Sequence, residues 1–207
     1  MSTTEYSPEL RENGLRLIKA VEKGDIEAVK QLLAQGAYIH AQDREGKCAL
    51  VAAAYKNNLE IVDLLIAAGA DVNMKDDSLQ SAYLIATSDG YVELLKKTLA
   101  AGADILCTDS YNGTGLIRAA DRGHVEVVRE LLKTKIRVNH VNRIGWTALH
   151  EAIILGDGGA RHTEVVRMLV EAGADVNLPD KEGTPLAHAK SQGFAEIVRI
   201  LEGAGAA

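Results

Sequence analysis

The chain has few of the residues on which several classes of protein depend. Aromatic residues make up 4% of its 207 residues, and there are 3 prolines and 2 cysteines. The two cysteines, Cys48 and Cys107, are too few for a disulfide framework and lack the Cys-x-x-Cys spacing of redox and zinc sites. Any core must therefore be aliphatic, and we expect two free thiols in a reducing compartment.

Clusters of basic residues and long apolar runs are also missing. The formal net charge is -6, whereas a surface that follows a phosphate backbone needs clustered Lys and Arg. No run approaches the roughly 20 apolar residues that span a bilayer, and the first residues lack the apolar stretch of a secretory signal. We expect neither a nucleic acid nor a membrane as partner, and a cytoplasmic location, or a periplasmic one if a signal peptide has been removed.

One sequence pattern returns at a fixed interval along the chain. The segments EIVDLLIAAGADVN, ELLKKTLAAGADIL and EVVRELLKTKIRVN begin at Glu60, Glu93 and Glu126, which are 33 residues apart, and a fourth copy begins at Glu164. Turn-forming acids and amides occupy positions 43, 76, 109 and 142, again 33 residues apart. Two independent registers therefore indicate one repeated structural unit.

Each repeat contains two short segments in which apolar residues follow helical spacing, for example residues 50–54 and 59–66. Gly69, Gly102 and Gly173 follow second segments, where a left-handed glycine commonly ends a helix. A polar stretch such as DREGK then predicts a hairpin turn before the next unit. Because neither helix is long enough to be stable alone, we expect neighbouring units to stack around an aliphatic core.

These segments resemble the ankyrin repeats. GWTALHEA, GTPLAHA, RGHVEVVRELL and AAGADVN, which begin at Gly145, Gly183, Arg122 and Ala67, are similar to signature pieces of that family. The order of units is similar to a bacterial group of short ankyrin proteins, some of them exported to the periplasm. The resemblance implies an all-α repeat fold, an α-solenoid of helix-turn-helix units with hairpin turns, which binds a protein partner without catalysis, metal or cofactor. We expect a monomer.

Six units can be placed after an N-terminal tail at residues 1–9. Arg16 and Lys19 interrupt the apolar pattern of the first unit, which is typical of a terminal cap facing water, and the last unit is the other cap. The expected units are residues 10–42, 43–75, 76–108, 109–141, 142–179 and 180–207.

Four positions depart from the repeat. Leu79 stands where a turn glycine or asparagine is expected and Thr98 where a core leucine is expected, so the third unit is predicted to be the least stable layer. Lys135 replaces a helix-ending glycine. The segment Asp180 to Leu186 is one residue shorter than Asp43 to Leu50, which predicts a tighter hairpin.

The fifth unit contains five extra residues between its two predicted helices. They fall in GDGGARHT, because Leu50 to Gly69 spans 19 residues and Leu149 to Gly173 spans 24. A Walker-type phosphate loop would need Gly-Lys-Ser/Thr at the start of a helix after a strand, which is not found here. We interpret the segment as a surface insertion with Asp157, Arg161 and His162 exposed or capping the second helix. A loop around Gly156–His162 that binds a small ligand or a peptide terminus is the alternative.

Catalytic and metal sites have little support in the sequence. His124 and His150 occupy positions that are structural in the ankyrin family, and His40 and His140 have no Cys or paired carboxylate at ligand spacing. No Gly-x-Ser-x-Gly elbow is present. An enzyme built around the Gly156–His162 insertion is the least favoured alternative.

The remaining candidates are binding residues, which in the ankyrin family lie on the hairpin tips and on the inward face of the first helices. Among them, Tyr111, Ile144 and Trp146 are large apolar side chains at predicted tips, where we see no core for them to enter. Aromatic and arginine anchors dominate the energetics of many interfaces. The predicted partner-binding residues are Arg44, Tyr55, Lys56, Asp89, Tyr111, Arg122, Arg143, Ile144 and Trp146.

Overall fold

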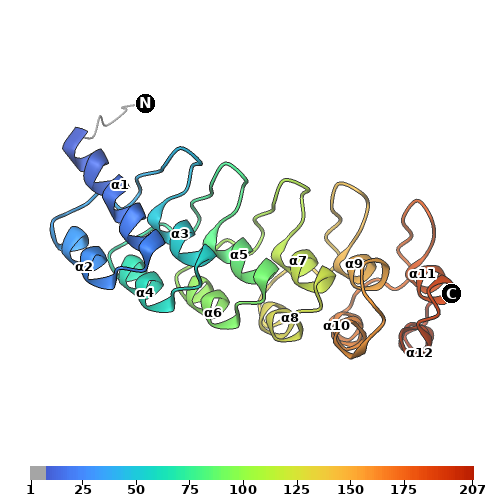
Figure 1. Cartoon of the computed structure of the whole chain (residues 1–207). Helices are drawn as coiled ribbons and strands as arrows, with labels where there is room; N and C mark the ends of the chain where they lie inside the picture. The colour runs from blue at the N-terminus through green and yellow to red at the C-terminus, as the bar shows by residue number, and fades with distance from the viewer. Residues whose placement is uncertain (1–7) are drawn as a thin grey trace. The chain divides into compact units, whose positions relative to one another are not determined.

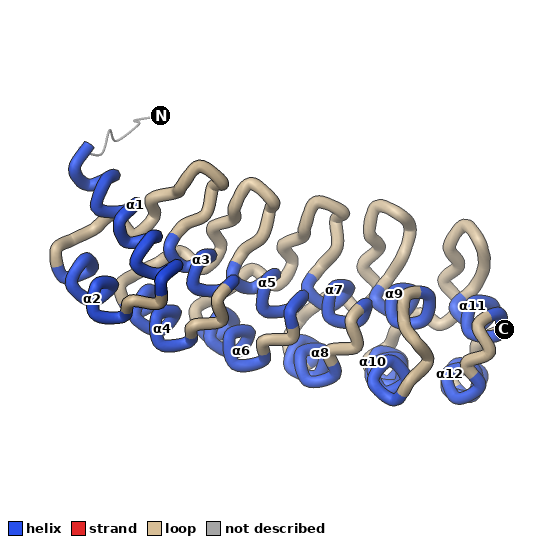
Figure 2. The backbone as a smooth tube through the Cα atoms, viewed as in Figure 1, coloured by secondary structure: helices blue, strands red, loops and turns tan. Residues whose placement is uncertain are grey.

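A computed structural model describes residues 8–207 and contains α-helices joined by turns and hairpin loops (Figure 1). The described part of the chain has twelve helices and no strand. Figure 2 distinguishes the helices, in blue, from the loops that join them, in tan. The helices are α1 Pro8–Lys23, α2 Ile26–Ala34, α3 Ala49–Tyr55, α4 Leu59–Ala67, α5 Ala82–Asp89, α6 Val92–Ala100, α7 Gly115–Asp121, α8 Val125–Leu132, α9 Ala148–Ile154, α10 Ala160–Glu171, α11 Pro185–Ser191 and α12 Ala195–Gly203.

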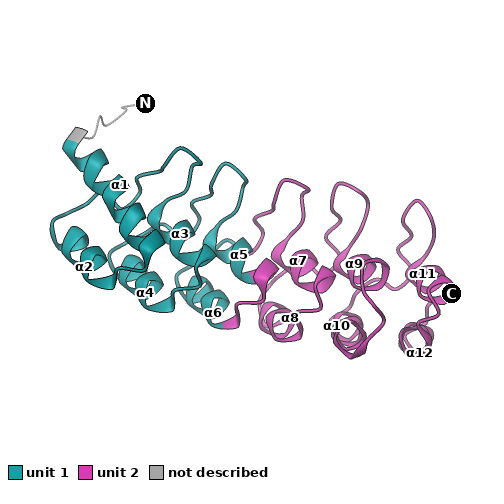
Figure 3. Cartoon of the chain, in the orientation of Figure 1, with its two compact units in different colours: residues 1–86, 93–104 teal, residues 87–92, 105–207 magenta. Residues whose placement is uncertain are grey.

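The chain forms two compact units, coloured separately in Figure 3. Unit 1 comprises residues 1–86 and 93–104, and unit 2 comprises residues 87–92 and 105–207. In unit 1, α1 packs against α2 and α3, and α4 packs against α2 and α3. In unit 2, α7, α9 and α11 form one row of adjacent helices, and α8, α10 and α12 form a second row packed against it. Both units are therefore two layers of helices, as the apolar spacing predicts.

Side-chain caps mark the N-termini of several helices. Asp25 and Asn58 accept hydrogen bonds from the backbone N–H groups of Ala28 and Ile61 at the starts of α2 and α4. Thr147 caps α9 in the same way through the N–H of His150. Each layer buries aliphatic side chains such as Leu65 and Leu131, so the stability of these helices comes from packing between repeats.

The first residue of each hairpin organises that hairpin. Oδ1 of Asp43 accepts the N–H groups of Glu45 and Lys47 at 2.8 and 2.9 Å. The corresponding oxygens of Asp76, Asp109 and Asn142 each accept two N–H groups in the same pattern. The backbone N–H of the first residue donates to the carbonyl of the fifth and closes each of these four hairpins. One side-chain oxygen thus satisfies two backbone donors that would otherwise depend on water.

The hairpin of the last repeat is tighter, as the sequence predicts. The N–H of Asp180 donates to the carbonyl of Gly183, three residues ahead, at 2.9 Å. In the first described hairpin the N–H of Asp43 instead reaches Lys47, four residues ahead. This loop is therefore one residue shorter. Oδ1 of Asp180 still accepts hydrogen bonds from the backbone N–H groups of Glu182 and Gly183.

The helix that lacks a terminal glycine ends by a different contact. Lys135 is not among the residues with positive φ in the described chain, whereas Gly102 and Gly173 at equivalent positions have φ of 86° and 88°. After α8, the Thr134 hydroxyl donates to the carbonyl of Leu131 at 2.6 Å and accepts the N–H of Ile136 at 3.3 Å. A threonine side chain takes over part of the capping that the left-handed glycine provides elsewhere.

The glycine-rich segment of the fifth unit combines exposed residues with one buried residue, His162. Asp157 and Arg161 are exposed, as expected, but His162 is only 6% exposed. Its Nε2 lies 3.0 Å from the carbonyl oxygen of Asp121 at the end of α7. The sequence left His162 either exposed or capping the second helix, and the structure excludes the exposed alternative. The ring is buried because α10 begins at Ala160 and turns it toward the preceding repeat.

His162 therefore replaces His124 one repeat later. Nε2 of His124 lies 3.0 Å from the carbonyl oxygen of Ser88 at the end of a first helix, as Nε2 of His162 lies from Asp121. The sequence separation of the two pairs is 36 and 41 residues, a difference equal to the insertion. The five extra residues lie between Gly156 and His162 and leave the contact between repeats unchanged.

A pair of deletions tests this account of the insertion. Removal of residues 157–161 joins Gly156 to His162, as Gly123 joins His124. It should leave the free energy of unfolding within about 1 kcal/mol of the parent, because only loop residues and the first two, exposed residues of α10 are lost. Removal of residues 158–162 has the same length but also removes the histidine. This second variant should be less stable than the first by about 1 kcal/mol or more. Urea unfolding followed by circular dichroism compares them, and equal stabilities would refute the assigned role of His162.

Leu79 generates a second prediction, because it has a left-handed backbone with φ of 59°. Asn112 occupies the equivalent place in the next hairpin with φ of 58°. Leu79→Asn should raise the free energy of unfolding by about 1 kcal/mol, since leucine is unfavourable in this region and asparagine tolerates it. The reciprocal change Asn112→Leu should lower it, and also loses the bond from Nδ2 to the Val141 carbonyl. Chemical unfolding measures both, and changes of the same sign would contradict the argument.

Candidate functional site

The predicted binding residues fall into the two units of the chain. Arg44, Tyr55 and Lys56 belong to unit 1, and all three are exposed. Tyr55 donates its hydroxyl to Oδ2 of Asp76 at 2.7 Å, so its ring lies against the next hairpin. Arg44 lines a hollow between α1 and the first hairpin that also includes Leu15. Neither Tyr55 nor Lys56 lines this hollow.

Unit 2 contains the other six predicted residues, and three of them, Tyr111, Ile144 and Trp146, line one pocket. Tyr111 and Ile144, on successive hairpins, are 65% and 46% exposed and line the same pocket. The N–H of Arg143 donates to the carbonyl of Tyr111 at 2.9 Å, which ties the two hairpins to each other. The Arg143 side chain is exposed beside them.

Asp89 and Arg122 lie apart from that pocket, at the ends of α5 and α7. Nη1 of Arg122 lies 3.0 Å from the Ser88 carbonyl and 3.4 Å from Oδ1 of Asp89. This exposed ion pair is at the long end of hydrogen-bonding distance and contributes little to stability. Both side chains remain accessible on the first-helix face.

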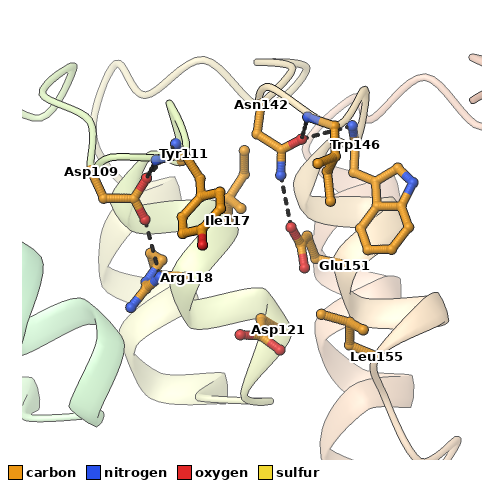
Figure 4. Close-up of a pocket in the computed structure, with 11 residues that line it drawn as sticks. Asp109, Tyr111, Ile117, Arg118, Asp121, Asn142, Trp146, Glu151 and Leu155 are labelled. Carbon is orange, nitrogen blue, oxygen red and sulfur yellow. Dashed lines mark hydrogen bonds and ion pairs between the residues drawn. The ribbon is translucent and has the colours of Figure 1, made fainter.

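Trp146 differs from the expectation that tip side chains have no structure to pack against. Its indole N–H donates to Oδ2 of Asp180 at 2.7 Å, and the residue is half-buried. In Figure 4 the ring points away from Tyr111. The sequence did not reveal this contact, although Asp180 follows Trp146 by almost one repeat, the interval at which side chains on successive hairpins meet.

The pocket below Tyr111 and Ile144 lies between α7 and α9, with a volume of about 170 Å³. Figure 4 shows Asp121 and Glu151 on these neighbouring helices, beneath the two hairpins. Leu155, just after α9, forms the far wall and is 53% exposed. The pocket thus combines an apolar, accessible rim with carboxyl groups inside it.

One carboxylate of the pocket is already neutralised. Asp109 is buried, and its Oδ2 accepts a hydrogen bond from Nη1 of Arg118 at 3.0 Å. Its Oδ1 holds the hairpin backbone. Asp109 and Arg118 therefore form a charge-paired wall of the pocket.

Glu151 is the unusual carboxyl group of the pocket. It is only 7% exposed, and its Oε1 accepts a hydrogen bond from Nδ2 of Asn142 at 2.8 Å. Burial, and next the nearby charge of Asp121, raise the pKa of Glu151 to about 7, against the lowering effects of Asn142 and Arg118. A pKa near neutrality marks a carboxyl group that lacks a cation of its own.

Sequence reasoning missed Glu151 and Leu155. Glu151 lies one 33-residue period after Arg118, and Leu155 one period after Arg122. A charged residue within the apolar segment ALHEAI, and an apolar residue where the other first helices have Lys56, Asp89 and Arg122, were the available signals. Neither residue was recognised as a binding candidate, because the segment was interpreted only as a family signature.

The histidines have structural partners. His124 and His162 contact the backbone carbonyls of Ser88 and Asp121. Nε2 of His40 accepts the N–H of Asp71, and Nε2 of His140 lies 2.8 Å from the Asn112 carbonyl. Nδ1 of His150 lies 2.9 Å from the Thr147 hydroxyl, and burial lowers the pKa of its ring. His188 lies 3.0 Å from Asp180. Within residues 8–207, no group of three or more His, Cys, Asp or Glu side chains is placed to hold a metal ion.

The polar groups of the glycine-rich segment are mostly used within it. Oδ1 of Asp157 accepts the N–H of Gly159 at 2.9 Å and lies 2.8 Å from Nδ1 of His162. The Thr163 hydroxyl donates to the Gly158 carbonyl. These bonds cap the start of α10 from inside the loop. Neither Cys48, which is buried, nor Cys107 forms a disulfide, as expected.

The fold and the site define the class of protein, an all-α helix-turn-helix repeat protein. Its features are paired helices, hairpins that begin with an acid or amide, and histidines that bridge successive repeats. Residues 17–109 and 82–180 match the family described as ankyrin repeats (3 copies). The chain belongs to the ankyrin repeat family.

Solved structures of similar proteins agree. An ankyrin repeat domain from Acinetobacter baumannii AYE is 48% identical, with a TM-score of 0.89 over 92% of this chain and 98% of that one. The ankyrin repeat protein EF0377 is 34% identical, with a TM-score of 0.87 over 91% of this chain and 97% of that one.

Curated relatives match shorter segments. The ankyrin repeat protein YahD of Escherichia coli is 49% identical over 77 residues, 37% of this chain and 38% of that protein. Protein phosphatase 1 regulatory subunit 27 of Mus musculus is 38% identical over 73 residues, 35% of this chain and 44% of that protein. The match spans less than half the length of either relative.

No helix in residues 8–207 combines the length and apolar character needed to cross a membrane.

The titration of Glu151 makes stability depend on pH. Its pKa in the folded chain, about 7, lies above the ordinary value of 4.5. Between these values the folded protein binds more protons than the unfolded chain, so the free energy of unfolding decreases as the pH rises from about 4.5 to about 7. The shift corresponds to about 3 kcal/mol at most.

Glu151→Gln should remove this dependence while keeping an oxygen for Asn142. Its free energy of unfolding should exceed that of the parent at pH 8, and the difference should vanish toward pH 4. Urea titrations at several pH values measure the difference, and Glu126→Gln on the exposed face of α8 is the matched control. A difference that does not change with pH would exclude Glu151 as the titrating group.

Proposed function

We propose that this ankyrin repeat chain is a non-catalytic interaction module that binds a protein partner through the hairpin tips and first-helix face of unit 2. The observation that carries the proposal is the accessible apolar rim formed by Tyr111, Ile144 and Leu155 over the carboxyl-lined pocket. Apolar side chains gathered around a pocket and bordered by charged residues are typical of interaction sites. Arg143 supplies a polar border, and Trp146 supports the hairpin from the opposite side.

The other predicted residues have lesser roles in this proposal. Asp89 and Arg122 extend the polar border along the first-helix face, where their ion pair is open to exchange with a partner. Arg44, Tyr55 and Lys56, in unit 1, are candidates for separate contacts. We also propose that the chain is divided into six repeats.

Relatives favour a protein partner, and the loop chemistry does not favour the alternatives. Ankyrin repeats are generally protein-interaction modules, and one partial relative is named a regulatory subunit of a phosphatase. The glycine-rich segment uses its carboxylate and histidine in internal bonds. A small-ligand site or an enzyme at Gly156–His162 would have to break these bonds first, which makes both alternatives less favourable.

A comparison of variants by affinity capture and mass spectrometry tests the proposal. Tyr111→Ala with Ile144→Ala should change the melting temperature little, because both side chains are exposed, and should deplete the proteins captured by the parent chain at least tenfold, since loss of interface anchors commonly costs about 2 kcal/mol. Glu126→Ala with Arg129→Ala, on the exposed face of α8, should retain them.

Leu149→Ala separates loss of folding from loss of binding. Leu149 is fully buried, so this change should destabilise the chain by roughly 2 to 5 kcal/mol and reduce capture only together with the melting temperature. If the double tip variant keeps every partner of the parent chain, the proposed surface is wrong. The second-helix face or the glycine-rich segment then becomes the candidate binding surface.

A further inference from the structure

The pocket in unit 2 has more acidic than basic groups. Asp109 and Arg118 neutralise each other through a 3.0 Å ion pair. Asp121 and Glu151 also line the pocket. Within residues 8–207 neither of these two carboxyl groups forms an ion pair shorter than 4.0 Å. Two acidic groups thus remain for a cation that the described chain does not supply.

Glu151 lines this pocket and uses one of its two carboxyl oxygens in a hydrogen bond within the described residues. Oε1 is held by Asn142 at 2.8 Å, and no hydrogen bond to Oε2 is found in the described part of the chain. The side chain is more than nine-tenths buried, so bulk water solvates it poorly. Its pKa of about 7 expresses this poor solvation. A donor entering the pocket would therefore meet a preoriented acceptor.

The rim is suited to a long, flat, apolar-stemmed cation. In Figure 4 the Tyr111 ring hangs from its hairpin toward α7, above the level of Asp121 and Glu151. Tyr111 and Leu155 are both more than half exposed, so a side chain can contact them on entry. A guanidinium group stacks on aromatic faces and offers several N–H donors in one plane, whereas an ammonium group is compact and strongly hydrated.

We propose that this pocket binds an arginine side chain from a segment of the protein partner, with its guanidinium group between Glu151 and Asp121 and its stem against Tyr111 and Leu155. The proposal rests on the proposed function, since it names the chemistry of the partner at the same surface. Charge complementarity carries the choice of occupant. The chain already contains one such pair at the equivalent position of the preceding repeat, where buried Asp109 binds the guanidinium group of Arg118.

Nuclear magnetic resonance with a minimal probe tests the pocket without a known partner. The full chain, labelled with ¹⁵N, is titrated at pH 8 with N-acetyl-arginine-N-methylamide. The citrulline compound has the same shape without the charge, and the lysine compound has a charge of another shape. The arginine probe should shift the amide signals of Tyr111, Glu151 and Leu155 with saturation in the millimolar range, and the citrulline probe should not.

Variants confirm which groups bind. Glu151→Gln and Asp121→Asn, alone and combined, should raise the Kd for the arginine probe, by about fivefold or more for the pair, while Glu126→Gln should leave it unchanged. Unchanged binding in the double variant, or equal shifts with the citrulline probe, would overturn the proposal. Equal affinity for the lysine probe would overturn the assignment to arginine.

The probe and the capture experiment fail independently. If the tip variants lose protein partners but the arginine probe does not bind, the proposed function stands and this inference fails. If the probe binds the pocket but the tip variants keep all partners, the pocket is real and the proposed interaction surface is wrong.

Discussion

In most of the described hairpins, one side chain holds the loop with one polar atom and binds a second segment with the other. In Asp76, Asp109 and Asp180, Oδ1 accepts loop N–H groups, while Oδ2 accepts a donor from another segment: the Tyr55 hydroxyl, the Arg118 guanidinium and the Trp146 indole. Buried backbone donors must be satisfied, so the first atom is required for the loop to form. The second atom connects the loop to its surroundings. Loop conformation and surface chemistry are thereby set by the same residue.

Much of the fold could be predicted because a 33-residue period is a strong signal. It predicted paired helices, left-handed residues after them and the short hairpin at Asp180, all of which the structure confirms. The burial of His162 was not predicted, because the insertion was treated as lying beyond the regular contacts. Once five residues are subtracted, its equivalence to His124 follows from the numbering alone.

The candidate site was less predictable than the fold for a physical reason. Tip residues such as Tyr111 and Ile144 could be selected because apolar groups at turns are unusual, and both line the pocket. Trp146 met the same criterion and also lines the pocket, but its indole N–H is already bonded to Asp180. Glu151 was missed because its burial, its bond to Asn142 and its pKa arise from a neighbouring repeat. Such properties depend on contacts between units and cannot be read from one unit.

Asn142 is the one amide among the residues that lead the described hairpins, and this difference limits how the repeats can be recombined. Its Nδ2 donates where the aspartates accept, and its partner Glu151 is correspondingly an acceptor. An aspartate at position 142 would place two carboxylates in contact, and a basic residue at position 151 would face the amide's donor. Anyone shuffling these repeats as interchangeable modules must therefore move a hairpin together with the first helix that follows it, because the two form a single matched part.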